Sequence, residues 1–166
     1  AIKWLSLAGN QGYTDAQYKL GWIYYHGEGV NQNYQNAFEW YSPAAEKGDL
    51  KAQFGLAIMY DNGYGVAQNF QKAFKWASLP AKNGNMKAQF FLGCLYENGE
   101  GVEKNFEEAV KWYSLAAEQG DNMAQSNLGH LYADEKTGKQ NYIKAHQWFS
   151  ISEAKEITTM EKLMDP

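Results

Sequence analysis

Apolar and polar residues follow a pattern that repeats every 36 residues along this chain. Each repeat opens on an alanine, followed at fixed offsets by a leucine, a small residue and a tyrosine. The opening alanines are Ala16, Ala52, Ala88 and Ala124. Within each repeat the apolar positions lie three and four residues apart, which places them on one face of an α-helix. The pattern therefore predicts a first helix in each repeat, the A helix, at 16–26, 52–62, 88–98 and 124–134.

A glycine-rich loop follows three of these four helices. It reads Gly-x-Gly-Val at residues 27–30, 63–66 and 99–102, whereas the fourth repeat has Glu-Lys-Thr-Gly at 135–138. Glycine adopts positive φ angles without the strain that other residues incur, and it is common directly after a helix. The loops are therefore expected to end the A helices.

A second helix, the B helix, is predicted after each loop. It begins at an aromatic residue (Tyr34, Phe70, Phe106, Tyr142) and runs to a glycine near 48, 84 and 120. Each B helix carries one tryptophan of a regular series: Trp4, Trp40, Trp76, Trp112 and Trp148. We interpret this series as buried scaffold, in which truncation to alanine costs about 3 to 5 kcal/mol. Pro43 and Pro80 fall inside B helices, where a proline removes a hydrogen bond and kinks the axis.

The pattern predicts an all-α array of antiparallel helix pairs, about four and a half repeats long. We assign residues 1–154 to this solenoid, with a half unit at 1–15 and units at 16–51, 52–87, 88–123 and 124–154. Residues 155–166 are expected to be a C-terminal tail or the start of a capping helix. Each unit of such an array touches only its neighbours, so the number of stacked units determines stability.

Composition argues against several classes of function. The 166 residues include 15 lysines, no arginine and 19 acidic residues, for a net charge of -4. Without guanidinium groups, and with an acidic balance, nucleic-acid binding is disfavoured. No apolar run approaches the roughly 20 residues of a membrane span. The lone Cys94 excludes an internal disulfide, and His26, His130 and His146 lie too far apart along the array to share one ion. We expect neither a metal nor a cofactor.

The motif A-x-x-x-L-G-x-x-Y-x-x-G-x-G-V, followed by K-A-x-x-W-Y-x-x-A-A-x-x-G, resembles the Sel-one-like repeat, a relative of the tetratricopeptide repeat. The resemblance runs from about Ile2 to Phe149, and 88–120 follows the motif almost throughout. It implies a right-handed superhelix of helix pairs with the A helices on its concave face. It also implies an adaptor that binds other proteins or peptides. The sequence leaves the location unknown: it favours a bacterial periplasmic or exported protein and does not exclude the cytoplasm.

If the A helices line the concave face, the residues that flank their tyrosines would contact a partner. These candidate residues are Tyr18, Trp22, Tyr25, His26, Lys51, Phe54, Ile58, Asp61, Asn62, Lys87, Phe90, Cys94, Glu97, Asn98, His130 and Asp134. Trp22 lies outside the regular tryptophan series and forms an aromatic stripe with Tyr18 and Tyr25, the residue types enriched in binding hot spots. The alternative is that Tyr18, like Phe54 and Phe90, packs against the neighbouring unit. For Cys94 the alternative is a buried, inert thiol.

Two other functions stay open beside a non-enzymatic scaffold. One is a hydrolase or β-lactam-interacting protein, because Ser152-x-x-Lys155 and Lys136-Thr137-Gly138 match motifs of penicillin-recognising enzymes. Their order is reversed, the intervening Ser-Asp-Asn is missing, and the β-lactam-associated relatives of this family carry repeated cysteine pairs that this chain lacks. The other is a self-assembly module, a homo-oligomer formed through exposed terminal repeats. Because the pattern begins within a unit and stops abruptly, we expect a longer natural protein.

Overall fold

The computed structural model describes the backbone of residues 2–137 and 141–164, and the side chains of 2–135, 137 and 141–153. The chain divides into two compact bodies. The N-terminal body comprises residues 1–83 with 100–102, and the C-terminal body comprises 84–99 with 103–166. Each body is built from successive helices that pack against their neighbours in the sequence.

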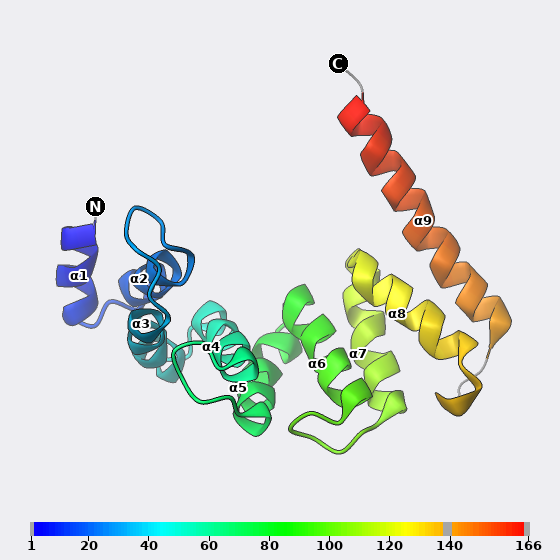
Figure 1. Cartoon of the computed structure of the whole chain (residues 1–166), viewed down its shortest axis with the longest axis horizontal. Coiled ribbons are helices and arrows are strands. Elements are labelled where there is room, and N and C mark those ends of the chain that lie inside the picture. Colours follow the sequence, from blue (N-terminus) through cyan, green and yellow to red (C-terminus); the bar gives the residue numbers. More distant parts are fainter. Residues whose placement is uncertain (1, 138–140, 165–166) are drawn as a thin grey trace. The chain divides into compact units, whose positions relative to one another are not determined.

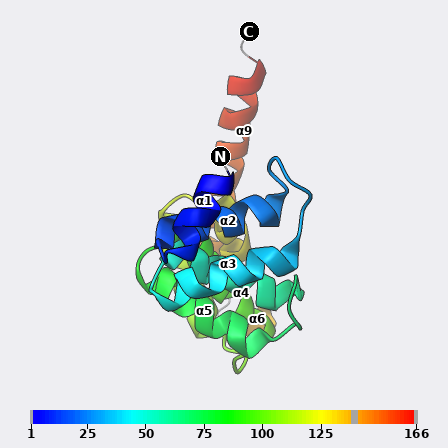
Figure 2. The same cartoon turned by 90° about the vertical axis from the view of Figure 1, so that its left-hand side faces the viewer.

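The described residues are helical or lie in turns and loops, with no strand, which confirms the all-α solenoid prediction. The N-terminal body contains α1 (Ile2–Asn10), α2 (Thr14–His26), α3 (Tyr34–Glu46), α4 (Leu50–Asn62) and α5 (Phe70–Lys82) (Figure 1). The C-terminal body contains α6 (Met86–Asn98), α7 (Phe106–Glu118), α8 (Asn122–Ala133), a 3-10 turn (Glu135–Thr137) and α9 (Tyr142–Met164). The loop that joins α2 to α3 extends beyond the helices in both views (Figure 1 and Figure 2).

The B helices begin at the four predicted aromatic residues, whereas all four A helices start two residues before their opening alanines. In three of the A helices a side-chain N-cap, which the sequence analysis did not identify, sets this start. Asp49 Oδ1 accepts a hydrogen bond from Ala52 N–H at 2.7 Å, and Asn85 and Asp121 cap α6 and α8 in the same way. Residues 155–164, expected as a tail or capping helix, continue α9 without a break.

In three of the four repeats the small residue of the A helix lies against an aromatic ring of the following B helix. A Cβ atom added to Gly21 would overlap the ring of Tyr41, and one added to Gly93 would overlap Tyr113. Gly129 has the same relation to Phe149. In the second repeat both positions are alanine, Ala57 and Ala77. Glycine is therefore needed where the facing residue is a ring, and alanine fits where that residue is small.

The tryptophan series is less buried than predicted. Of the five tryptophans, Trp112 is buried, three are half-buried and Trp4 is 73% exposed. The residue that fills the interior comes one position later, since Tyr41 and Tyr113 are 3% and 0% exposed. Pro43 and Pro80 do lie inside α3 and α5, as predicted.

A buried glutamine joins consecutive helix pairs, and the sequence analysis missed it. Gln17 and Gln53 each donate a side-chain hydrogen bond of 3.0 Å to a carbonyl of the preceding B-type helix, at Gly9 and Ala45. In the C-terminal body, Gln125 donates to the carbonyl of Ala117 at 3.0 Å. The signal was present in the sequence, because a glutamine follows each opening alanine.

The second glycine of the loops also fixes consecutive repeats against each other. Gly65 and Gly101 have φ angles of 67° and 71°, and a Cβ atom on either would overlap the backbone at the start of the preceding B helix. The backbone atoms concerned belong to Tyr34 for Gly65 and to Phe70 for Gly101. Only glycine satisfies both the positive φ and the close approach.

No helix in the part of the chain that the structure describes is long and apolar enough to cross a bilayer.

Candidate partner-binding surface

None of the sixteen candidate residues is buried in the structure. Seven are exposed: His26, Lys51, Asn62, Lys87, Asn98, His130 and Asp134. The other nine are half-buried, among them Trp22, Tyr25 and Cys94. All sixteen side chains are therefore at least partly accessible from solvent, and their role in binding stays a prediction.

Five aromatic side chains of the N-terminal body lie in a continuous series of ring contacts, which we call the ring array. Trp22 contacts His26 with ring centroids 4.3 Å apart, and His26 contacts Tyr25 at 4.9 Å. Tyr25 meets the edge of Tyr34 at 5.3 Å, and Tyr34 stacks on Tyr64 at 4.5 Å with only 8° between the planes. Four of the five side chains are half-buried, and His26 is exposed.

Sequence reasoning identified three members of the ring array and missed two. Trp22, Tyr25 and His26 share α2, whereas Tyr34 begins α3 and Tyr64 lies in the loop after α4. Tyr34 was assigned only as a helix start. Tyr64 carried a usable signal, because it occupies the x position of a Gly-x-Gly-Val loop in which the other two repeats have glutamate.

An open hollow of about 390 Å³ lies beside the ring array. Trp22 lines it together with Tyr18 and Ile23 from the same helix and Leu5 from α1. Lys19 and Glu28 add one positive and one negative charge to its walls. Trp22 therefore borders both the hollow and the ring array.

The rings of Tyr18 and Phe90 each contact the buried tyrosine of their own repeat. Tyr18 lies 5.9 Å from Tyr41, and Phe90 lies 5.6 Å from Tyr113, measured between ring centroids. Each ring therefore has an aromatic contact within its own unit. Lys51 Nζ of the next repeat lies 5.7 Å from the Tyr18 ring centroid, within range of a cation–π interaction. Burial, and secondarily Asp49, raises the pKa of Tyr18.

A second hollow, of about 480 Å³, lies in the C-terminal body and brings four candidate residues together. These are Glu97, Asn98, His130 and Asp134. Lys104 also lines it, with its Nζ 4.7 Å from the centroid of the Phe106 ring. The hollow is polar and mixed in charge, unlike the aromatic surface of the N-terminal body.

Cys94 is half-buried and belongs to a short polar chain. The buried Tyr113 hydroxyl donates to Glu97 Oε2 at 2.6 Å and lies 3.3 Å from Cys94 Sγ. Since the hydroxyl has one proton, the shorter contact with the carboxylate takes it, and the thiol is then placed to donate to the phenol oxygen. Burial, followed by Cys94 and Glu97, strongly raises the pKa of Tyr113. The arrangement orients Glu97 and supplies no base for the thiol.

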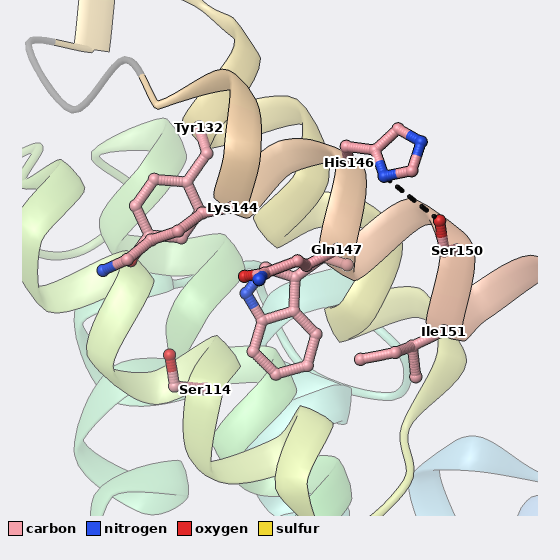
Figure 3. Close-up of a pocket in the computed structure, with 8 residues that line it drawn as sticks. Ser114, Tyr132, Lys144, His146, Gln147, Ser150 and Ile151 are labelled. Atoms are coloured by element: carbon pink, nitrogen blue, oxygen red, sulfur yellow. Dashed lines mark hydrogen bonds between the residues drawn. The ribbon is translucent and has the colours of Figure 1, made fainter.

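The largest of these hollows, about 670 Å³, lies on the side formed by the B helices α7 and α9 and by Tyr132 (Figure 3). Sequence reasoning did not single it out. Its walls include His146 and Ser150, which lie on consecutive turns of α9 with Oγ and Nδ1 3.5 Å apart. Among the residues with described side chains, the lining contains no carboxylate that could orient the imidazole as in a nucleophilic triad.

The features that favoured an enzyme gain no support. Ser152 is 8% exposed, which leaves its hydroxyl poorly placed for attack on a substrate. Gly138 and the side chains of Lys136 and Lys155 lie outside the described part of the chain. Within those residues, no group of three or more histidine, cysteine, aspartate or glutamate side chains is arranged to hold a metal ion.

Comparison with known proteins identifies the repeat. The Sel1 repeat matches residues 1–13, 14–49, 50–85, 87–121 and 122–154. A protective antigen of uropathogenic Escherichia coli with an SLR fold is 34% identical, with a TM-score of 0.85 over 93% of this chain and 33% of its own. A Sel1 repeat protein of Oxalobacter formigenes is 37% identical, with a TM-score of 0.80 over 87% of this chain and 58% of its own. The cysteine rich protein B of Helicobacter pylori is 27% identical, with a TM-score of 0.57 over 75% of this chain and 94% of its own.

The chain thus spans about a third of the length of the Escherichia coli antigen and somewhat over half of the length of the Oxalobacter formigenes protein. None of the curated proteins compared with it matches. Sel1 repeat proteins are generally non-catalytic scaffolds for protein interactions. Consecutive matches cover nearly all of the sequence, and its helix pairs adopt the fold of solved Sel1 repeat structures. On both grounds, the chain belongs to the Sel1 repeat family.

Proposed function

We propose that this chain is a non-enzymatic scaffold that binds a protein or peptide partner on the face formed by its A helices, with the ring array and the adjoining hollow of the N-terminal body as the main contact. The observation that carries the proposal is the ring array itself. Exposed aromatic clusters of this kind are typical of interaction surfaces.

The physical argument rests on what these rings gain from a partner. Tyrosine and tryptophan combine a large apolar area with little side-chain entropy, and they dominate binding hot spots. In the ring array the contacts between the rings hold them in place before any partner arrives. A partner therefore buries apolar area without ordering mobile side chains, which favours affinity.

The hollow beside Trp22 offers a place for one partner side chain. Its walls are mostly apolar and come from two helices that pack directly on each other, α1 and α2. Anchoring of one side chain in such a hollow, surrounded by flatter aromatic contacts, is a common arrangement of interfaces. Trp22 is the residue expected to contribute most, because it borders both features.

A capture experiment tests this proposal. The wild-type chain, Trp22→Ala and Tyr64→Ala are immobilised and incubated with the proteome of the source organism, and the bound proteins are quantified by mass spectrometry. The matched control is Tyr142→Ala, which removes an aromatic side chain that is 65% exposed on α9 and is not a member of the ring array. Circular dichroism verifies that all four proteins are folded.

We expect a partner that is retained by wild type and Tyr142→Ala and lost from the other two variants. For the purified partner, Trp22→Ala should weaken binding by about 2 kcal/mol or more, the usual size of a hot-spot effect. Equal recovery of every partner by all four proteins would contradict the assignment of the ring array as the binding surface.

A further inference from the structure

Two successive repeats of the N-terminal body place side chains of different chemistry in the same position. Tyr25 in α2 faces Tyr64 in the next loop, with ring centroids 6.3 Å apart. Exactly one repeat later, at 25 + 36 and 64 + 36, the corresponding residues are Asp61 and Glu100. An aromatic pair is thus followed by a pair of carboxylates.

The backbone shows that the two pairs have the same geometry. Gly65 lies against the backbone of Tyr34, and Gly101 lies against the backbone of Phe70, so both loops are held by the preceding B helix in the same way. The loop residue just before each of these glycines therefore faces the last turn of the preceding A helix in both repeats. This places Glu100 beside Asp61 as Tyr64 lies beside Tyr25.

The carboxylate pair is electrostatically unfavourable in the isolated chain. Burial, and secondarily Glu100, raises the pKa of Asp61. Around Asp61, Gln68 donates a side-chain hydrogen bond to the main-chain carbonyl at 2.6 Å, and Asn62 donates to Oδ2 at 3.4 Å. Lys72, at the start of α5, lies with its Nζ 5.0 Å from the centroid of the Tyr60 ring. A cation at Asp61 and Glu100 would relieve the repulsion between them.

Building on the scaffold function proposed above, we propose that the partner presents a basic, extended segment, whose lysine or arginine side chains lie on the rings of Tyr25 and Tyr64 and against the carboxylates of Asp61 and Glu100. Aromatic faces and carboxylates both attract these cations, and the aliphatic stems of lysine and arginine pack on tyrosine rings. Glu28 and Lys19 line the hollow beside Trp22, so its wall carries one carboxylate and one cation. The two pairs belong to adjacent repeats, which suits cations on alternate residues of one extended segment, because alternate side chains share a face.

Binding of defined peptides to the whole chain tests this inference. Three fluorescein-labelled decapeptides are compared by fluorescence anisotropy at low and physiological salt: alternating Lys-Ser, Gln-Ser and Glu-Ser. The decisive variant is Asp61→Asn/Glu100→Gln. Its matched control, Glu39→Gln/Glu46→Gln, removes the same charge from exposed positions of α3. Tyr64→Leu tests the aromatic contribution, and a neutral oligosaccharide, maltohexaose, competes as the alternative ligand of an aromatic surface.

We expect the lysine peptide to bind about tenfold more tightly than the glutamine peptide, with the glutamate peptide weakest. Asp61→Asn/Glu100→Gln and Tyr64→Leu should each remove most of this preference, whereas the control should keep it. Equal binding of the lysine and glutamine peptides, an equal loss in the control, or displacement of the lysine peptide by maltohexaose would overturn the inference.

The captured partner separates this inference from the function on which it depends. A partner lost from Trp22→Ala but retained by Asp61→Asn/Glu100→Gln would leave the scaffold function standing and overturn the basic segment. A partner retained by both variants would overturn both. Loss from both variants, with retention by Glu39→Gln/Glu46→Gln, supports both.

Discussion

The charged form of Asp61 lowers the stability of the folded chain. Its carboxyl group is half-buried beside Glu100, and both burial and that neighbour raise its pKa above the ordinary value of 3.8. The folded chain therefore holds this proton more tightly than the unfolded chain does. Linkage then requires that the stability contributed by Asp61 fall as the pH rises from about that ordinary value through the raised one.

The first prediction follows from this sign. Asp61→Asn should stabilise the chain at pH 7, by less than about 1 kcal/mol, because solvent screens the exposed part of the carboxyl group. The gain should shrink as the pH is lowered, since the wild-type carboxyl group then becomes neutral as well. Thermal unfolding of both proteins between pH 3 and pH 7 checks this. A gain that is independent of pH would show that the asparagine acts through packing instead of charge.

For single residues, the sequence predicts which side chains are accessible better than it predicts which side chains they contact. The candidate residues on the A helices are all at least partly accessible, as their spacing implied. The position of Trp22 in the sequence, however, does not show which rings surround it. Those contacts join residues 22 to 64 across two repeats, and they depend on a loop whose path is set by backbone contacts of Gly65. Helical periodicity describes one element at a time, so it cannot supply this information.

Helix pairs are matched by the volumes of two facing side chains. Gly93 faces the ring of Tyr113, whereas the corresponding residues of the second repeat, Ala57 and Ala77, are both small. Tyr113 is fully buried, and a methyl group at residue 93 would overlap its ring. The effect of an alanine at residue 93 should therefore depend on what faces it.

The second prediction is that the effect of Gly93→Ala on the free energy of unfolding changes sign when the ring of Tyr113 is removed. In the wild-type chain, Gly93→Ala should destabilise the fold by about 1 to 3 kcal/mol through overpacking. In a Tyr113→Ala background, which itself costs about 3 to 5 kcal/mol, the same change should stabilise it by up to about 1 kcal/mol. The gain arises because alanine is the better helix former once the ring is gone. Chemical denaturation of the four proteins completes the double-mutant cycle, and additive effects would refute the matching of the two positions.

The sequence predicted the elements well wherever the chemistry was local. The aromatic starts of the B helices and the glycine ends of the A helices were correct, since both depend on neighbouring residues. Two features needed the third dimension. The buried Gln53 donates to a carbonyl eight residues earlier in another helix, and the interior is filled by Tyr41 and Tyr113 instead of by the tryptophans. A repeated residue shows that a position matters without showing which atoms it contacts.

Stability in the whole molecule is expected to be distributed locally, because the chain forms two compact bodies built from neighbouring helix contacts. In such arrays the loss of one contact is felt mainly by the adjacent repeats. Gln17 and Gln125 offer equivalent contacts in the two bodies, each with a hydrogen bond of 3.0 Å to a backbone carbonyl.

The third prediction compares these two residues. Gln125→Ala should increase hydrogen exchange in α7 and α8 more than in α1 and α2, and Gln17→Ala should do the reverse. Each change removes one of the hydrogen bonds that a buried carbonyl accepts, at a cost of about 0.5 to 1.5 kcal/mol, while the backbone bond from Gly12 N–H to Gly9 or from Gly120 N–H to Ala117 stays. Hydrogen exchange measured by mass spectrometry resolves the two bodies. A uniform increase along the chain in both variants would indicate one cooperative unit instead.

The loops described above combine two fixed glycines with one residue that varies, Glu28, Tyr64 or Glu100. The glycines cannot change without disturbing the backbone, whereas the residue between them is limited only by what it must touch. On the function proposed above, a single codon per repeat can therefore alter the ligand preference of this edge while the architecture stays intact. Glu100→Tyr, for example, would extend the aromatic contact by one repeat, and a series of such exchanges would make this chain a programmable receptor.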